Sequence, residues 1–445
     1  MSGLSGALTS DAGPAPTAPA APPIGGTPVP RWPSYAVLGA WTLVGLGISA
    51  HDGEWSLPGL IALLAAFALL LAATAAGGRL QVPDRRMLAL PLAVAFAAAL
   101  AHPARRLMHV HGGALAAVDV LAAVTAAAAL GSLFVRRSSL AWRVGAALAA
   151  ATGIVTIIVA PDPHIDVWYL LQQSSTGLLH GQDMYRQHWA HSHGLQAIYP
   201  YLPMTTVLLA PLRWLVGDVR AGLLLASLLT SWQLRRIAPL APAGLALLVL
   251  VHPHWAFLVD QSWTEPLLVA LLTAAVFAIS RDRPVLAVVA LGVALACKQH
   301  IVLLLPLFAV WPRFGLRRTL ASAGLAFVLV LPWIVWSPGQ FWHDAVKANL
   351  DLGVIPRALC VPSLLLRHDV QVGFWFTLLV LGVAYAVVLW RAPRTPSGLA
   401  LGSAVVLLAL DLANKQSFFN HYTLPMGLLV VALATATVQR KEQRA

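Results

Sequence analysis

The sequence predicts an all-α polytopic membrane protein with about 14 transmembrane helices, and three observations carry this prediction. Of the 445 residues, 59% are hydrophobic and only 10% are charged, and the mean hydropathy is +0.76. Water-soluble proteins carry about 25% charged residues, so this chain cannot cover itself with an ordinary hydrated surface. Apolar runs long enough to span a bilayer also recur along most of the chain. We expect two extracytoplasmic loops with short amphipathic helices between these spans.

The predicted elements fall into five segments. Residues 1–33 are rich in Ala, Pro, Gly, Ser and Thr and predict a disordered tail, because such a composition cannot bury a core. We expect extra N-terminal transmembrane helices over 34–140, a central module over 141–345 with an external loop at 161–200, C-terminal transmembrane helices over 346–437 preceded by an external loop at 337–371, and a cytoplasmic tail over 438–445. The predicted spans lie near 34–50, 56–76, 87–103, 114–135, 141–160, 202–217, 238–257, 264–280, 284–297, 299–312, 319–336, 372–390, 398–414 and 421–437.

Basic residues set the orientation of these spans. The formal net charge is +12, and Lys and Arg cluster between apolar segments, as cytoplasmic loops do under the positive-inside rule. With the N-terminus inside, both long loops fall outside, together with Lys298–His300 and the turn at 415–420. The counts from the two termini agree only if 219–234 does not cross, so we expect an in-plane or re-entrant helix there. Arg105–Arg106 is an exception, since it falls in an outer loop.

Several classes of function are excluded by motifs that the sequence lacks. No basic patch interleaved with aromatic residues offers a nucleic-acid surface. No P-loop, GxGxxG or GxSxG motif occurs, which argues against ATP-driven transport, nicotinamide chemistry and serine hydrolysis. The two cysteines, Cys297 and Cys360, are expected to be unpaired. We expect no cofactor and no metal: His188, His191 and His193 lack the helical spacing and the Cys or Glu partner of a metal site, and contact with substrate hydroxyls or simple exposure suits them better.

Two carboxylates begin the first outer loop at the membrane edge. Asp162 and Asp166 follow an apolar span directly, and residues 167–179 have the pattern of an amphipathic helix. A carboxylate at such a boundary is partly desolvated, which raises its basicity, and it can then take a proton from an attacking hydroxyl. We therefore predict Asp166 as a general base, with Asp162 in reserve. The alternative is that both residues only cap a helix or start a loop.

A charged residue also interrupts an apolar hairpin at Lys298. A lysine at membrane depth is costly and is functional by default, and its ammonium group can bind a lipid phosphate. Gln299 and His300 stand beside it, and His421 follows Asn420 at another outer helix start. These residues are predicted to bind a donor phosphate or a sugar hydroxyl. The alternatives are a lysine that snorkels to the headgroups and a helix cap at 420–421.

The second outer loop offers a further cation. Residues 342–353 read as a short amphipathic helix on the membrane surface, and Arg357 follows them. Arg357 is predicted to hold phosphate together with Lys298. The alternative is an arginine that only faces water or lipid headgroups.

The loop sequence resembles the GT-C superfamily of membrane glycosyltransferases, and most closely the actinobacterial polyprenyl-phosphate-mannose-dependent α-mannosyltransferases. The resemblance covers roughly 150–345 and rests on Asp166, Gly181-x-Asp183-x-Tyr185, Tyr199-Pro200-Tyr201-x-Pro203, Asp260-Gln261 and the helix pair broken at Lys298-Gln299. It implies a catalytic base at Asp166 and substrate-binding roles for Tyr185 and Gln261. In that family the acidic loop follows the first span, whereas here it follows the fifth.

Three classes of function remain open. The first is an inverting glycosyltransferase in the plasma membrane, with an extracytoplasmic active site, a polyprenyl-phosphate sugar as donor and a cell-envelope glycolipid or polysaccharide as acceptor. Mannose is the expected sugar, and arabinofuranose is the alternative. The second is a transporter or lipid flippase, which predicts charged residues at mid-depth, broken helices and inverted repeats. A structural membrane partner of an envelope synthase is a third hypothesis, in which Asp166 is dispensable.

Overall fold

The computed structural model describes residues 30–77, 79–101, 108–187 and 198–442. Most of the tail predicted at 1–33 lies outside these residues, as do Arg105–Arg106 and the three histidines at 188, 191 and 193. The predicted cytoplasmic tail at 438–445 is described only to residue 442, as the end of a helix. Within the described residues the chain is helical and holds no β-strand. The predicted all-α class is confirmed.

Seven helices of the described chain are long and apolar enough to cross a membrane. They are α2 (Leu57–Ala75), α4 (Gly112–Gly131), α5 (Ser138–Val159), α14 (Gly315–Trp336), α18 (Phe374–Arg391), α19 (Pro396–Ala413) and α20 (Phe419–Glu442). Further helices at predicted spans are α1 (Trp32–Ser49), α3 (Arg85–Leu100), α11 (Glu265–Ser280) and α12 (Pro284–Leu295). The chain is a multi-pass membrane protein, and the number of spans stays a prediction.

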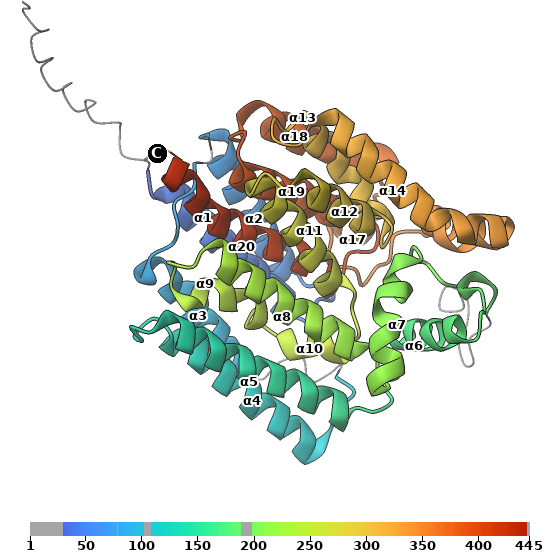
Figure 1. Ribbon diagram of the computed structural model, residues 1–445, viewed down its shortest axis with the longest axis horizontal. Coiled ribbons are helices and arrows are strands. Elements are labelled where there is room, and N and C mark those ends of the chain that lie inside the picture. The colour runs from blue at the N-terminus through green and yellow to red at the C-terminus, as the bar shows by residue number, and fades with distance from the viewer. Residues whose placement is uncertain (1–29, 78, 102–107, 188–197, 443–445) are drawn as a thin grey trace, which may run out of the picture.

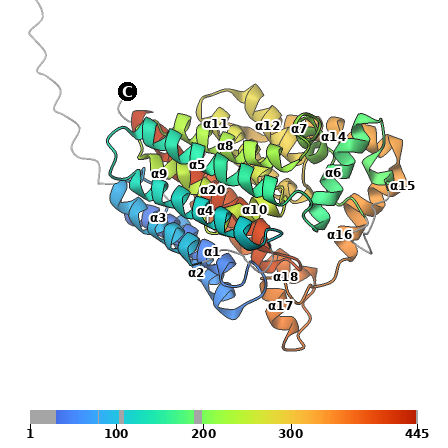
Figure 2. The ribbon, with the colours of Figure 1, turned by 90° about the horizontal axis from the view of Figure 1, so that it is seen from below.

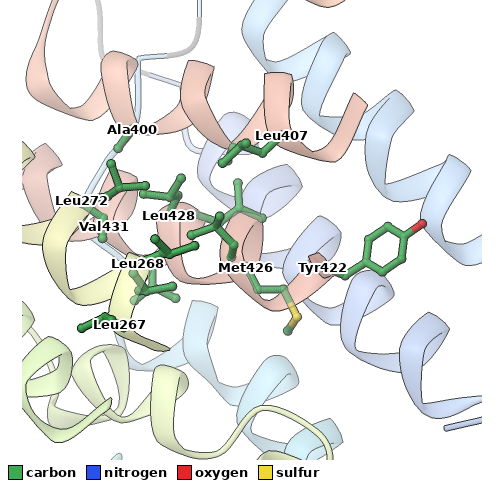
Figure 3. Packing of buried hydrophobic residues seen from close by; sticks show 14 of the residues in the cluster. Leu267, Leu268, Leu272, Ala400, Leu407, Tyr422, Met426, Leu428 and Val431 are labelled. Carbon is green, nitrogen blue, oxygen red and sulfur yellow. The ribbon is translucent and has the colours of Figure 1, made fainter. Parts of the chain in front are cut away.

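Helices α19 and α20 form the centre of the bundle. Of the apolar window of each, 94% and 89% is buried, and α11 and α1 pack against α20. Figure 3 shows side chains of α11, α19 and α20 meeting in this core, among them Leu268, Leu407 and Leu428. By contrast, α14 turns large apolar side chains outward, and Val335 is 72% exposed. Such an outer face suits lipid and not water.

Helix α8 (Arg220–Ile237) contradicts the in-plane placement predicted for 219–234. It runs beside the candidate span α5 (Figure 1) and in the opposite direction. Near the first turn of α8, Arg220 donates to the carbonyl of Ala160, which follows the end of α5, at 2.6 Å. Past the other end of α8, the carbonyl of Ala241 accepts from Ser138, the first residue of α5, at 3.3 Å. Helix α8 therefore crosses the same thickness as α5.

Helix α7 (Met204–Val216) contradicts the span predicted at 202–217. The N–H of Met204 donates to the carbonyl of Ala296, beside Lys298, at 3.1 Å. The carbonyl of Gly217, just past the other end, accepts from Gln172 of the first loop at 2.8 Å. Both ends of α7 therefore lie against segments that the topology places together.

The span predicted at 238–257 is broken. It consists of α9 (Ala243–Leu247), a 3-10 turn at Leu248–Leu250 and α10 (Trp255–Asp260). Pro253 cannot donate the backbone hydrogen bond that would continue the helix, and His254 has a left-handed φ of 64°. The predicted break at Lys298 is present, since α12 ends at Leu295. The span predicted at 299–312 is not one continuous helix: a 3-10 helix at Gln299–Leu304 leads into α13 (Leu305–Val310).

Both predicted loop helices are present. The first loop holds α6 (Asp166–Leu179), and the second holds α15 (Pro338–Phe341), a π-helical turn at Trp342–Lys347 and α16 (Ala348–Asp351). A short helix α17 (Val361–Leu366) follows. In Figures 1 and 2, α6 and α7 lie beside the far end of α14, at one end of the bundle. We call this the loop end.

Candidate functional site

The two long loops and the hairpin tip meet at the loop end. The side-chain amide nitrogen of Gln299 donates to the carbonyl of Pro200 in the first loop at 2.8 Å and to that of Ala345 in the second loop at 2.7 Å. The N–H of Tyr199 donates to Asp344 of the π-helical turn at 3.2 Å. The predicted convergence of these segments is confirmed.

Lys298 is held in a buried cluster with two other helices. Its ammonium group lies 2.6 Å from the Glu265 carboxylate at the start of α11. Asn420, near the start of α20, donates to the same carboxylate oxygen at 2.9 Å. The side chains of Lys298 and Glu265 are 13% and 1% exposed. The ammonium also donates to the Thr264 hydroxyl at 3.5 Å. A shielded lysine with these two partners is fixed in place, and its third N–H bond can point toward a ligand.

Two histidines border this cluster. His300 and His421 both lie within electrostatic range of Lys298 and Glu265. The Nδ1 of His421 accepts a hydrogen bond from the N–H of Phe418 at 3.2 Å. The neutral ring therefore carries its proton on Nε2 and can donate it to an anion or a hydroxyl. This arrangement is compatible with the predicted role of His421.

Asp166 is the first residue of α6, and α6 is fixed against the corner between α7 and α8. Gln172 donates to the carbonyl of Gly217 and accepts from the N–H of Val219 at 2.9 Å. Trp214 donates to the carbonyl of Ser175 at 2.8 Å. These contacts hold the helix along most of its length, so the position of the Asp166 carboxylate is set by the fold.

Tyr201 connects Asp166 with the lysine cluster. Its ring centre lies 5.8 Å from the Lys298 ammonium. Burial raises the pKa of Tyr201 well above its usual value, and the charges of Asp166 and Glu265 raise it further. Tyr201 therefore lies near Lys298 and within electrostatic range of Asp166 and Glu265, although 132 positions separate Asp166 from Lys298 in the sequence.

Asp166 has a raised pKa. Burial is the main cause, and it is opposed by the hydrogen bond from the Val167 N–H at 2.8 Å and by the positive charge of Arg357. Burial disfavours the ionised carboxylate, which makes this group a better proton acceptor than an ordinary aspartate.

A pH profile tests this assignment. Only the ionised carboxylate can take a proton, so activity should fall as the pH drops through the raised pKa of Asp166. The acid limb of kcat/KM should therefore lie above about pH 3.9, the value for a free aspartate. Arg357→Gln should move this limb to still higher pH, because it removes a cation that favours the charged form. A limb that stays in place in this variant would show that Arg357 does not act on the titrating group.

A cavity of about 1000 Å³ opens beside α6. Asp162 lines it, whereas Asp166 and Lys298 do not. Asp162 is exposed and accepts from the Tyr169 hydroxyl at 3.1 Å. The cavity wall combines aromatic rings with amides and charged groups, including Trp168, Tyr169, Trp336, Gln172, Gln173, Gln182, His180, Arg186 and Arg213. Aromatic rings can pack against the C–H faces of a sugar, and amides can hydrogen-bond to its hydroxyl groups. This lining therefore suits a carbohydrate.

Three predicted binding residues have structural partners in this fold. Gln299 uses its amide nitrogen for the two loop carbonyls, and the oxygen that remains is an acceptor, which a phosphate does not bind. Tyr185 is 1% exposed and donates to the carbonyl of Tyr201 at 2.8 Å. Gln261 is buried and donates to Asp260, which also accepts from the N–H of His109. Their contacts with phosphate or substrate stay predictions.

Two carboxylates of the site, Glu265 and Asp344, are not among the residues predicted from the sequence. A usable signal existed for Glu265, because a lysine at membrane depth needs a counter-charge, and few acidic residues lie near predicted outer helix ends. No sequence pattern pairs Asp344 with Tyr199, since the contact joins two loops 145 positions apart.

Among the described residues, no three His, Cys, Asp or Glu side chains are grouped so that they could hold a metal ion. Of the five histidines in or near the first loop, His164 and His180 are described. His164 contacts the Tyr169 hydroxyl at 3.2 Å, and His180 lines the cavity.

Comparison with known proteins gives one structural similarity. No family model and no curated protein matches the sequence. A crystal structure of ArnT from Cupriavidus metallidurans bound to undecaprenyl phosphate superposes with a TM-score of 0.45 and 16% sequence identity. The match covers 67% of this chain and 59% of that one, so this chain spans less than two thirds of it. A TM-score at this level does not establish a shared fold.

Proposed function

We propose that this chain is a membrane glycosyltransferase of the GT-C type, with a polyprenyl-phosphate sugar as donor. The observation that carries the proposal is the position of Tyr201 at the loop end, 5.8 Å from the Lys298 ammonium and within electrostatic range of Asp166, together with a cavity of polar and aromatic lining beside α6. A proton acceptor, a cation and a cavity suited to sugars are the parts that this transfer needs. The positive-inside pattern supports an extracytoplasmic loop end.

The reaction is a displacement at the anomeric carbon of the donor sugar. An acceptor hydroxyl forms the new carbon–oxygen bond, and the bond from the anomeric carbon to the phosphate oxygen breaks. The polyprenyl phosphate leaves with the electron pair, and Asp166 takes the hydroxyl proton. Attack from the face opposite the leaving group inverts the anomeric centre. Lys298 and Arg357 stabilise the charge that develops on the phosphate.

The donor and the acceptor approach from different sides. The polyprenyl chain lies in the bilayer with its phosphate near Lys298. The acceptor glycan, from a cell-envelope glycolipid or polysaccharide, occupies the cavity beside α6, with Asp162 and Tyr169 at its edge. Mannose is the proposed sugar, and arabinofuranose is the alternative.

Transfer by the purified protein tests this proposal. The protein in lipid nanodiscs, given polyprenyl-phosphate [³H]mannose and a membrane glycolipid extract, should move the label to the acceptor and leave polyprenyl phosphate. Polyprenyl-phosphate [³H]arabinofuranose distinguishes the two sugars, and a nucleotide sugar serves as the negative control. The proposal fails if neither lipid-linked sugar is consumed, or if only the nucleotide sugar is used.

The broken segment α9–α10 favours a second candidate, a lipid or sugar transporter. Discontinuous helices line substrate sites in transporters, and His252 and His254 are buried at this break. Proteoliposomes that carry a fluorescent polyprenyl-phosphate sugar in one leaflet test it. Protein-dependent exchange of the lipid between leaflets, unchanged by Asp166→Asn, supports transport over transfer.

A further inference from the structure

The loop between α1 and α2 reaches the second loop of the candidate site. Near the end of this loop, Trp55 donates its N–H to the carbonyl of Arg357 at 2.8 Å. The neighbouring residue, Glu54, forms an isolated antiparallel bridge with Ala358. Residues 51–55 belong to the N-terminal helices, for which the sequence analysis gave no role. These contacts join them to the site.

The segment of the second loop around Arg357 and Ala358 is hydrogen-bonded on two sides. Opposite the α1–α2 loop, the N–H of Ile355 donates to Lys415 at 2.9 Å and that of Leu359 donates to Ser417 at 2.8 Å, in both cases to the carbonyl. Residues 415–417 lead directly to Asn420, which binds Glu265 of the lysine cluster. A three-layer arrangement of short backbone segments therefore extends from the N-terminal helices to Lys298.

The side chains of Glu54 and Trp55 also contact two arginines of the second loop. The Arg357 guanidinium lies 3.7 Å from the Glu54 carboxylate, and the Arg367 guanidinium lies over the Trp55 ring, 3.9 Å from its centre. The side chain of Arg357 is 72% exposed, so one face of it stays open to a ligand. An exposed ion pair of this kind is weak, which leaves Arg357 able to bind an incoming anion.

The close approach of the α1–α2 loop depends on Gly53. Its φ is 78°, and a Cβ placed there would lie 2.3 Å from the Cβ of Phe419. Phe419 precedes Asn420, so the loop rests directly on the start of α20. Gly77, after α2, has a similar φ of 87° but no atom within 4 Å of its virtual Cβ. Of these two glycines, Gly53 alone combines the left-handed conformation with a tight contact.

We propose that the α1–α2 loop is a positioning element of the transfer site, in which Glu54 and Trp55 hold Arg357 and Arg367 ready for the phosphate of an anionic lipid. This inference rests on the proposed function for its substrate. It assigns the N-terminal helices a part in donor binding, and it predicts that their loop affects donor KM more than kcat.

Variants of the two contact residues test the positioning role. Glu54→Gln and Trp55→Ala should each raise the donor KM about two- to fivefold, in keeping with weak exposed contacts, while kcat stays within about twofold. Trp55→Phe should restore the KM, because it keeps a ring beneath Arg367. Asp351→Asn is the matched control: it removes another exposed ion pair of the same loop, with Lys347, and should leave the KM unchanged.

Variants of two glycines test, without any enzymatic assay, whether the α1–α2 loop holds the second loop in place; we call this contact the clamp. Gly53→Ala and Gly77→Ala both place a Cβ at positive φ, but only the first displaces Phe419. Hydrogen exchange at the Trp55 and Leu359 amides should be faster in Gly53→Ala than in Gly77→Ala. Equal exchange in both variants would overturn the clamp.

The kinetic experiment and the hydrogen-exchange experiment together separate this inference from the proposed function. A wild-type protein that transfers no sugar defeats the proposed function, and hydrogen exchange then still tests the clamp. Normal transfer with an unchanged KM in both Glu54→Gln and Trp55→Ala overturns the positioning role. A Trp55→Phe variant as impaired as Trp55→Ala also overturns it, because the contact would then not depend on a ring beneath the cation.

Discussion

Asp166→Asn should lower kcat by about two to four orders of magnitude, the usual contribution of a general base, with little change in donor KM. Asparagine keeps the shape of the side chain but cannot accept the proton. Because burial already disfavours the ionised carboxylate, as its raised pKa indicates, the variant should not lower the thermal unfolding temperature. Single-turnover transfer of a labelled sugar measures the chemical step directly.

Asp162→Asn is the matched control for this prediction. It lies four positions away on the same loop, and it is exposed and bonded to Tyr169. Its removal should change kcat by no more than about threefold, since an exposed hydrogen bond contributes little. If Asp162→Asn abolishes transfer and Asp166→Asn does not, the base is Asp162 and the acceptor cavity contains the reacting centre.

Lys298→Gln has the second large expected effect, on donor binding and on stability together. It removes the cation proposed to bind the phosphate, and it leaves the Glu265 carboxylate buried without its partner. Loss of one member of a buried pair costs about 3 kcal/mol or more, so the unfolding temperature should fall markedly. The donor KM should rise by at least about tenfold, the factor that corresponds to 1.4 kcal/mol of lost binding.

The double variant Lys298→Gln/Glu265→Gln separates these two effects. Two neutral amides can bond to each other, so the unfolding temperature should recover while the donor KM stays high. Lys347→Gln is the control, because the pair of Lys347 with Asp351 is more than half exposed and such pairs contribute little. Recovery of both stability and KM in the double variant would show that Lys298 serves only to balance Glu265.

The interchange of α7 and α8 shows where hydropathy fails as a guide. The segment of α8 holds polar residues that lower its hydropathy, but Ser231 and Gln233 are buried against neighbouring helices and do not face lipid. Ser231, for example, donates to the carbonyl of Ala246 at 2.7 Å. A polar side chain with a partner in the bundle costs little at membrane depth, and sequence alone does not reveal the partner. The segment of α7 is apolar, but it is only 13 residues long.

The residues of the candidate site also differ in whether the sequence alone could predict their roles. Lys298 stood out because a charge inside an apolar hairpin is costly wherever the hairpin lies, and Asp166 stood out because it begins an amphipathic helix beside a span. Gln299 looked equally suited to bind a ligand, but its amide nitrogen is taken up by two loop carbonyls. The roles of Gln299 and Glu265 depend on which groups lie opposite them.

The sequence by itself determined the helical membrane class, most of the spans and the end of the bundle where polar residues gather. These properties follow from transfer free energies and charge bias, which act on each segment separately. Only the tertiary structure decided which polar groups are partners, which helix crosses beside α5, and that the α1–α2 loop contacts the arginines of the second loop. Those outcomes depend on contacts between segments that lie far apart in the sequence, from 33 positions for Lys298 and Glu265 to about 300 for Glu54 and Arg357, and no local pattern encodes them.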